Sequence, residues 1–297
     1  MILFGLIARL NRQLFHPMLA SAQNECKVTT ECRCIFKLRT EYDLMKVIIN
    51  ADDFGLNTEV NAAILDLMGK GRITSVTMLA NAPAIQKGVK QLPKDAQCSF
   101  GVHLNLTEFA PLTPRRELGE LACCLDEDGC FSNENVLRSK KITRELRECM
   151  FRELKLQVEL LLSHGVQVSH FDSHNHVHTL PGLLPVLKRL QKHFGIWKVR
   201  TTRNVYPLDA PVSWQLLLKK NVWDFALRHY QSTTCTSAFT SFAVFYDLAT
   251  KVALPYESIE LMVHPGNTEF QEETGLLLSR WQEAIIFPIR LIPYQEL

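Results

Sequence analysis

The sequence predicts a single α/β domain of the (β/α) barrel-like, TIM-barrel-related class. Three observations lead to this fold. The chain has 297 residues, enough to bury the core of one barrel. Short apolar runs alternate with segments of helical periodicity, which is the pattern of parallel βαβ units. Acids and histidines follow several of the apolar runs, where parallel barrels collect their functional side chains.

The first half of the domain alternates strands with helices. The apolar, β-branched run 47–49 belongs to a strand that starts near residue 45, and residues 59–69 have helical spacing behind a cap at Asn57 or Thr58. The next expected elements are a strand at 73–79, a helix at 83–92 and a strand at 99–106. Residues 107–140 hold prolines and glycines without periodicity, which predicts a long irregular insertion of the kind that covers functional sites.

The second half continues the alternation. Residues 143–163 form the strongest expected helix, because an apolar stripe lies opposite charged residues and Gly165 ends it. The remaining expected elements are a strand at 166–171, helices at 183–194 and 212–229, and strands at 197–201, 238–245 and 258–263. The tryptophans Trp197, Trp214 and Trp223 fit packing within these elements.

Composition excludes several classes of protein. The formal net charge is only +2, so nothing favours nucleic acid as a partner, and no apolar run approaches the roughly 20 residues of a membrane span. The nine cysteines are irregularly spaced without paired CxxC motifs, which favours free thiols in a reducing compartment. A small bridged loop at Cys123, Cys124 and Cys130 is the alternative. No pattern reports an oligomeric state.

Residues 1–44 differ from the rest. Their first 19 residues carry Arg9 and Arg12 and no acid, with apolar residues at roughly helical spacing. This is typical of an organelle transit peptide or an amphipathic surface helix, and a disordered extension or a gene-model artefact is the simpler interpretation. We therefore expect an N-terminal extension at 1–44 and the domain at 45–297. The expected location is cytoplasmic, or mitochondrial if the extension is a transit peptide.

Two adjacent carboxylates, Asp52 and Asp53, come directly after the first strand. Placing them together raises the electrostatic free energy unless a cation or hydrogen bonds compensate. A divalent metal would compensate, since one acid can be a ligand while the other stays free as a base. The alternative is that one carboxylate caps the following helix and the other is solvated.

Histidines follow three later strands. His174, His176 and His178 stand at alternate positions behind Asp172, and three imidazoles so placed indicate metal binding or catalysis. His103 and His264 end two further strands, and each could instead be a satisfied structural histidine. The other histidines of the domain receive no role: His164, His170, His193 and His229. One Asp with two His ligands would leave metal positions open for water and substrate, which indicates metal-assisted hydrolysis of an amide.

Five motifs in order resemble the YdjC/ChbG-like carbohydrate deacetylases. The motifs are NADDFG at 50–55, TSVT at 74–77, GVHLNLT at 101–107, SHFDSHNHVH at 169–178 and ELMVHPG at 260–266. The resemblance implies a single catalytic domain that hydrolyses N-acetyl groups of amino-sugar oligosaccharides with a divalent metal, Mg²⁺ first and Zn²⁺ or Mn²⁺ as alternatives.

Carried over position by position, the resemblance implies a set of site residues. The metal ligands fall on Asp53, His103 and His174, the proton acceptor on Asp52, and the histidine of the late motif on His264. His176 and His178 also match and are expected to support the ligands or face substrate. No other cofactor is implied.

The ends of the chain depart from the family. Residues 1–44 match nothing in it, and after 266 the sequence is atypical, so we expect the barrel to lack its final element and to expose an apolar seam. Two other functions stay open on the residues alone. One is another metal-dependent amidohydrolase or phosphoesterase, and the other is a non-catalytic sugar-binding relative.

Overall fold

The protein is described here from a computed structural model, which covers residues 44–229 and 232–297. The expectations for residues 1–43, including Cys26, Cys32 and Cys34, lie outside the described residues. The strands are β1 Met45–Phe54, β2 Ser75–Met78, β3 Ser99–Leu104, β4 Val168–Ser173, β5 Lys198–Val199, β6 Ala238–Ser241, β7 Ser258–Val263 and β8 Ile289–Leu291. The α-helices are α3 Thr58–Gly69, α4 Ile85–Val89, α5 Glu134–Ser139, α6 Arg144–Ser163, α7 Leu184–Phe194, α8 Trp214–His229, α9 Phe242–Ala249 and α10 Gln271–Leu278.

All paired strands are parallel and form one sheet in the order β5-β4-β3-β2-β1-β7-β6, with β8 also paired to β1. The edge strands β5 and β6 form no ladder with each other in the described part of the chain. A single bridge between Asn204 and Phe239 links β6 to the segment after β5. The sheet is therefore a half-barrel in a single α/β domain, and the complete TIM-barrel ring that the sequence suggested is not formed by strand pairing.

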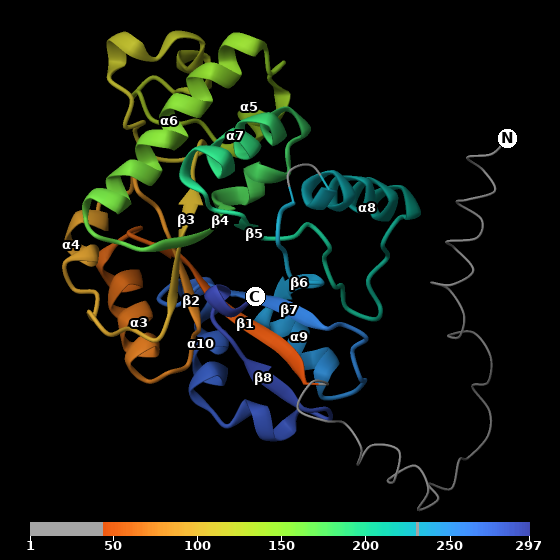
Figure 1. Cartoon of the computed structure of the whole chain (residues 1–297). Helices are drawn as coiled ribbons and strands as arrows, with labels where there is room; N and C mark the ends of the chain where they lie inside the picture. The colour runs from red at the N-terminus through yellow and green to blue at the C-terminus, as the bar shows by residue number, and fades with distance from the viewer. Residues whose placement is uncertain (1–43, 230–231) are drawn as a thin grey trace, which may run out of the picture. The chain divides into compact units, whose positions relative to one another are not determined.

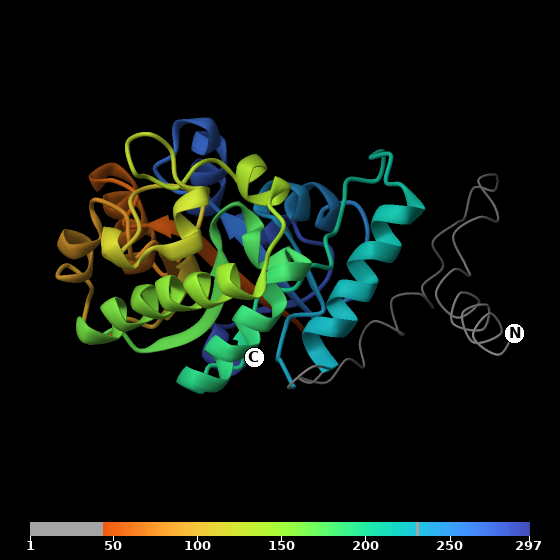
Figure 2. The same ribbon diagram turned by 90° about the horizontal axis from the view of Figure 1, so that it is seen from above.

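Strand β1 is central because it is buried along almost its whole length. It pairs with β2 near its carboxyl end, with β7 along Lys46 to Ala51, and with β8 along its first residues. In both views α3 and α4 lie on the side of the domain away from α8 (Figure 1 and Figure 2). This arrangement brings the carboxyl ends of β1, β3, β4 and β7 to one end of the sheet.

The helix caps follow the local sequence. Asn57 is the N-cap of α3, its side chain accepting from the Val60 N–H at 2.8 Å. Because Asn57 fills that place, neither Asp52 nor Asp53 is the cap that the sequence left open. Thr143 caps α6 in the same way, at 3.0 Å from the Leu146 nitrogen.

One expected strand is partly wrong. Residues 238–241 form β6, but 242–245, expected to continue it, begin α9. Ser241 accepts from the Val244 N–H and caps the helix, and Phe242 and Phe245 share its buried side. A short apolar run fits a buried helix as well as a buried strand, so the pattern alone did not separate them.

The C-terminal segment forms one further strand. After α10 the chain forms β8, which pairs with β1, and Ile292 and Tyr294 beyond β8 are buried. That the barrel lacks its final element stays a prediction. An open groove of about 420 Å³ lies beside β8, lined by Gln282, residues 285–289 and Leu291. Ile286 in this groove is 52% exposed.

Other expectations concern surface and cysteines. Trp214 is 70% exposed and Trp197 is 40% exposed, so the prediction that these two tryptophans pack within their elements is wrong. The six described cysteines are all free thiols, as the sequence predicted. No helix in residues 44–229 and 232–297 is both long and apolar enough to cross a membrane.

Candidate active site

The carboxyl end of β1 is distorted where it presents its two acids. The pairing of β1 with β2 shifts register between Ala51 and Phe54, and Asp53 has a φ of 68°. A non-glycine residue in this left-handed region is strained, and such strain is typical of functional positions. The irregularity turns two consecutive carboxylates, Asp52 and Asp53, toward different surroundings.

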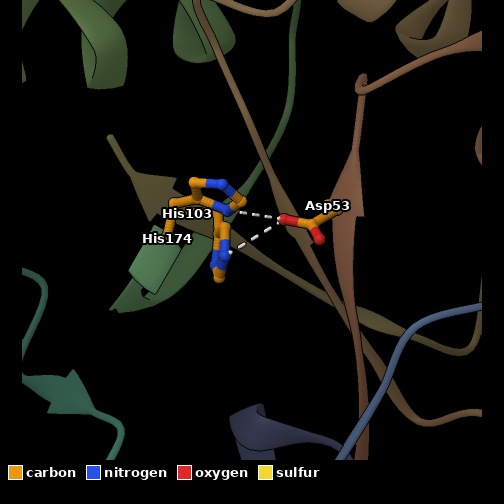
Figure 3. Close-up of side chains that lie close together, drawn as sticks. All are labelled: Asp53, His103 and His174. Carbon is orange, nitrogen blue, oxygen red and sulfur yellow. Dashed lines mark hydrogen bonds and ion pairs between the residues drawn. The ribbon is translucent and has the colours of Figure 1, made fainter. Parts of the chain in front are cut away.

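Asp53 faces two imidazoles. Its Oδ1 lies 3.3 Å from Nε2 of His103 and 3.0 Å from Nδ1 of His174. Figure 3 shows both rings pointing at this one oxygen, and their centroids are 5.5 Å apart in an edge-on arrangement. The structure therefore brings together the three residues that the resemblance implied as metal ligands.

Each imidazole is held from behind by another carboxylate. Nδ1 of His103 lies 2.7 Å from Asp172, which is fully buried, and Nε2 of His174 lies 2.8 Å from Glu108. A carboxylate on the far nitrogen fixes the orientation of a ligating ring and raises its basicity. Asp172 thus orients His103 on the neighbouring strand, whereas the sequence suggested that it would orient a histidine of its own segment.

The donor set fits a divalent cation. One ligand atom from each of Asp53, His103 and His174 lies within 4.8 Å of the others. Burial lowers the pKa of His103, but Asp172 and Asp52 outweigh it and raise that pKa to about 10. Burial is likewise outweighed at His174, where Asp53 and Glu108 raise the pKa to about 9. The cluster thus favours positive charge at this point, which a metal ion or bound protons can supply.

Asp52 faces a guanidinium instead. Nη1 of Arg200 donates to Oδ2 at 2.7 Å, and Nη2 donates to Oδ1 at 2.7 Å. The Asn50 amide also donates to Oδ1 at 2.7 Å. Burial raises the pKa of Asp52, but Arg200 outweighs burial and holds that pKa well below its ordinary value. Asp52, His103 and Asp172 also lie within 4.8 Å of one another, but there Arg200 already supplies the positive charge.

Arg200 is in turn held by further buried side chains beneath Asp52. Its Nε donates to Glu260 at 2.7 Å, and the other oxygen of Glu260 accepts a hydrogen bond from the hydroxyl of Tyr294. The Tyr294 ring stacks on His170 with centroids 3.8 Å apart, and His170 reaches Oδ1 of Asn50 at 3.3 Å. Tyr294 therefore connects to Asp52 along two routes, one through Glu260 and Arg200 and one through His170 and Asn50.

Room for His170 depends on a glycine. A Cβ at position 101 would lie 2.5 Å from Nε2 of His170, a distance that real Cβ atoms essentially never show. Gly101 of β3 therefore makes room for the ring, which stacks on Tyr294. His170, to which the sequence gave no role, is thus part of the support beneath Asp52.

His264 lies at the end of β7, as predicted. Its backbone N–H donates to Glu273 at 3.0 Å, and its ring stacks on Phe270 with centroids 4.7 Å apart. It is close enough to Asp52 for its positive charge to lower the pKa of that carboxyl. The Asp53 cluster does not include it.

His176 and His178 belong to the same 3-10 turn as His174, η5 His174–Thr179. Asn175 and His176 are both in the left-handed region, with φ of 50° and 52°. This strained turn sends His174 to Asp53 and leaves His176 and His178 beside a separate cavity.

Sequence reasoning missed several residues of the site. Arg200 stood in an expected strand without a recognisable motif, Glu260 opened the late motif but was given no role, and Glu108 stood in the irregular insertion. A charged residue within a mostly apolar strand was the available signal for Glu260, because burying a charge requires a partner. Arg200 carried a weaker signal, since Lys198 is a second charge in the same short run. Glu273 and Tyr294 carried no such signal.

The fold and the site together define a class: an α/β protein with a parallel half-barrel that gathers acids and imidazoles at its carboxyl end. Comparison with known proteins places the chain within that class. The family model of the YdjC-like proteins matches residues 46–284, so the chain belongs to the YdjC-like family.

Similar proteins include carbohydrate deacetylases of several bacteria. That of Listeria monocytogenes serotype 4b is 30% identical over 254 residues, covering 85% of this chain and 93% of the relative. Those of Halalkalibacterium halodurans and Vibrio campbellii are 36% and 38% identical, covering 53% and 51% of this chain. These two matches span only 64% and 57% of the relatives' own lengths.

A solved structure shares the fold. It is from Enterococcus faecalis and carries a provisional assignment as a cellobiose-phosphate cleavage protein. It covers 85% of this chain and 98% of its own with a TM-score of 0.67 at 23% sequence identity. At that identity the likeness establishes the fold alone.

Proposed function

We propose that this protein is a metal-dependent hydrolase that removes N-acetyl groups from acetylated amino-sugar oligosaccharides. The observation that carries the proposal is the convergence of Asp53, His103 and His174, with a carboxylate behind each imidazole. The relatives named carbohydrate deacetylases support the substrate class. The domain boundaries at 45–297 and the cytoplasmic location stay predictions.

Asp53, His103 and His174 would hold the metal. A divalent cation there would supply a Lewis acid that polarises the amide carbonyl and lowers the pKa of water. A carboxylate with two imidazoles accepts Zn²⁺ and Mn²⁺ as well as the Mg²⁺ implied by the resemblance, so the ion is to be identified by reconstitution.

Asp52 would accept the proton of the attacking water. Oδ1 already accepts from Arg200 and Asn50, whereas Oδ2 accepts from Arg200 alone among the described residues and keeps a free lone pair. Arg200 keeps Asp52 ionised and fixes its orientation. The low pKa keeps Asp52 in the carboxylate form, which is the form that can accept a proton.

His264 would protonate the leaving amine. Its hydrogen-bonded backbone and stacked ring hold the imidazole at the end of β7, close to Asp52. Water then adds to the amide carbonyl, its proton goes to Asp52, the C–N bond breaks, and the amine takes a proton from His264. The products are acetate and the free amino sugar.

Acetate release from N,N′-diacetylchitobiose tests the proposal. We expect the wild-type protein to release acetate, a chelator to abolish release, and Mg²⁺, Mn²⁺ or Zn²⁺ added back singly to restore it. Asp52→Asn should lower kcat by roughly 10²- to 10⁴-fold. Asp66→Asn is the matched control, because Asp66 is an exposed carboxylate paired with Lys70 on α3, and it should leave release unchanged.

Other outcomes would overturn the proposal. Release that persists in chelator excludes metal dependence. Sugar binding without acetate release would favour the non-catalytic relative, and phosphate release from phosphoesters in the presence of metal would favour the phosphoesterase alternative.

A further inference from the structure

The insertion at residues 107–140 reaches the proposed metal site at the turn that carries His174. Thr107 and Glu108 stand at the start of the insertion, shortly after β3, and Arg138 stands near its end, in α5. The turn itself is η5, which follows β4. Two parts of the insertion that are far apart in the sequence therefore meet one short segment of the site.

The apex of this turn has an uncommon backbone conformation. Asn175 and His176 have φ of 50° and 52°, in the left-handed region. Asparagine and histidine enter this region more readily than most residues, but usually singly, so two in succession need support from their surroundings. The Ser173 hydroxyl accepts the His178 backbone N–H at 2.9 Å, and this bond closes the base of the turn. It leaves the apex at 175 and 176 to be fixed by other contacts.

The insertion supplies such contacts from two sides. The Asn175 side-chain amide donates to the Thr107 hydroxyl at 3.1 Å, and Nη2 of Arg138 donates to the Asn175 backbone carbonyl at 3.2 Å. Glu108, beside Thr107, holds Nε2 of His174 at 2.8 Å. One strained residue is thus held by its side chain and by its backbone, and the proposed ligand next to it is held by its ring.

The two ends of the insertion are anchored differently. The Thr107 backbone N–H donates to the Asn105 side chain at 3.0 Å, and the Asn105 amide donates to the Glu108 carbonyl at 2.8 Å. Asn105 is fully buried. The Arg138 side chain is instead 39% exposed, and its Nη2 also lies 3.3 Å from Glu134 of the same helix. The start of the insertion is therefore a fixed support, and α5 is the part whose contact with the turn can be made or lost.

We propose that Thr107 and Arg138 are positioning residues for His174: by fixing Asn175 they keep the turn in the conformation that points the imidazole at Asp53. The inference rests on the metal site of the proposed function, and not on the acetate-releasing step. Since these contacts favour the metal-binding conformation of the turn, bound metal must favour the contacts by the same factor. Each direction of this coupling can be measured.

Metal affinity tests the first direction. Chelator-treated protein is titrated with Mn²⁺ and, separately, with Zn²⁺ in a calorimeter. We expect Arg138→Met and Thr107→Val each to weaken binding by roughly threefold to tenfold, which is less than the 10- to 100-fold effect of a partner directly on a ligand. Arg116→Met is the matched control, because Arg116 belongs to the same insertion, is 86% exposed and pairs with its neighbour Glu117. It should bind metal as the wild type does.

The sign of the Arg138 effect separates positioning from simple charge. A guanidinium near a cation site repels the metal, so Arg138→Met would strengthen binding if charge were all that Arg138 contributed. Arg138→Lys keeps the charge but loses the planar donor group, and we expect it to weaken binding as well. Stronger binding by Arg138→Met, or an affinity equal to that of Arg116→Met, would overturn the inference.

Hydrogen exchange tests the second direction. In α5 the Lys140 backbone N–H donates to the Leu137 carbonyl at 3.2 Å. We expect residues 133–140 to exchange more slowly with metal than with chelator, by a factor similar to the affinity loss, and Arg138→Met to remove this difference. A merely structural role of Arg138 would instead speed exchange equally in both conditions. Exchange at 133–140 that is independent of metal in the wild type would overturn the inference.

These measurements also separate the inference from the proposed function. Weakened binding and metal-dependent exchange in a protein that releases no acetate would keep the positioning role and remove the deacetylase activity. Chelator-sensitive acetate release with unchanged metal affinity in both variants would keep the activity and remove the positioning role. At saturating metal we expect both variants to regain the wild-type kcat, because Thr107 and Arg138 act on the orientation of a ligand and not on Asp52.

Discussion

Beneath Asp52 the structure is a closed network of buried charges, whereas around Asp53 the same strand faces imidazoles and the partly exposed Glu108. Arg200, Asp172 and Glu260 are all fully buried, and Arg200 forms ion pairs with both of these carboxylates and with Asp52. Around Asp53, the side chain of Glu108 is 44% exposed and that of His174 is 14% exposed. The protein thus supplies its own cation to one acid and leaves the other acid to an ion from solvent.

The contrast separates two tasks. Arg200 compensates the negative charge of the buried carboxylates and holds Asp52 in one orientation at all times, although burying several charges costs free energy. The Asp53 cluster can exchange protons for a metal, because its positive charge is not built into the chain. Changes beneath Asp52 should therefore affect folding and catalysis together, and changes around Asp53 should affect metal binding.

The largest effect is expected from Arg200→Gln. Removing the guanidinium leaves Asp52, Asp172 and Glu260 without their common partner, which should lower the free energy of unfolding by roughly 3–5 kcal/mol. Urea denaturation measures the loss. Arg116→Gln is the control, since Arg116 is 86% exposed and its replacement should leave the free energy of unfolding unchanged. Similar urea midpoints for both variants would show that the buried charges beneath Asp52 do not act as one network.

Tyr294→Phe should have the next largest effect. It removes the hydroxyl that donates a hydrogen bond to Glu260, while the aromatic ring stays stacked on His170. A buried carboxylate oxygen without its donor costs roughly 1–3 kcal/mol, and the hold of Glu260 on Arg200 weakens. We expect kcat to fall about tenfold with KM unchanged, because Asp52 loses orientation rather than substrate contact.

Ile292→Ala is the matched control for Tyr294. Ile292 is equally buried in the same C-terminal segment and packs with Ile48 and Tyr294, but its apolar side chain contributes no hydrogen bond or charge to the network. The variant should lower stability through a cavity and leave kcat unchanged. If it lowers kcat as much as Tyr294→Phe does, the two routes from Tyr294 to Asp52 play no part in catalysis.

The pH dependence of stability should distinguish the metal-free protein from the loaded one. Without metal, the pKa values of His103 and His174 are raised to about 10 and about 9, from about 6.5 in the unfolded chain. The stability that their protons contribute is therefore fully present below pH 6.5 and is lost as pH rises through 9 to 10. Bound metal needs neutral imidazoles, so it should oppose this loss and bind more tightly as pH rises.

Thermal unfolding from pH 6 to pH 10 measures this difference, with chelator and with each metal. We expect Tm to fall over the upper part of the range in chelator and to fall less with the correct metal. Identical curves would show that neither imidazole binds the ion.

The sequence predicted the residues around Asp53 better than the buried charges beneath Asp52. The ends of apolar strands drew attention to Asp53, His103 and the histidines at 174–178, and the resemblance to the family then implied Asp53, His103 and His174 as the ligands. Arg200 was missed although it is as central, since its partner Asp52 lies 148 residues away and no local spacing marks the pair. Tyr294 was missed because the C-terminal segment resembled nothing in the family.

The fold was predicted with the same asymmetry. The βαβ alternation and most elements from 45 to 263 are as expected, because their periodicity is local. The strand β8 and the gap in pairing between β5 and β6 were not foreseen. Both depend on which strands meet in space, and apolar runs of three or four residues do not specify their partners.

The smallest effect is expected from Glu108→Gln. Glu108 holds Nε2 of His174 at 2.8 Å, as Asp172 holds His103, but it is partly exposed while Asp172 is buried. Loss of a carboxylate behind a ligating histidine lowers metal affinity by roughly 10- to 100-fold, and solvent at Glu108 should keep the loss near tenfold. Metal titration of chelated protein measures the affinity, and acetate release at saturating metal should recover to the wild-type rate. Recovery is the decisive part, because Glu108 orients His174 without touching Asp52. A kcat that stays low at saturating metal would mean that Glu108 acts on substrate, and the division between the two carboxylates would then no longer describe the site.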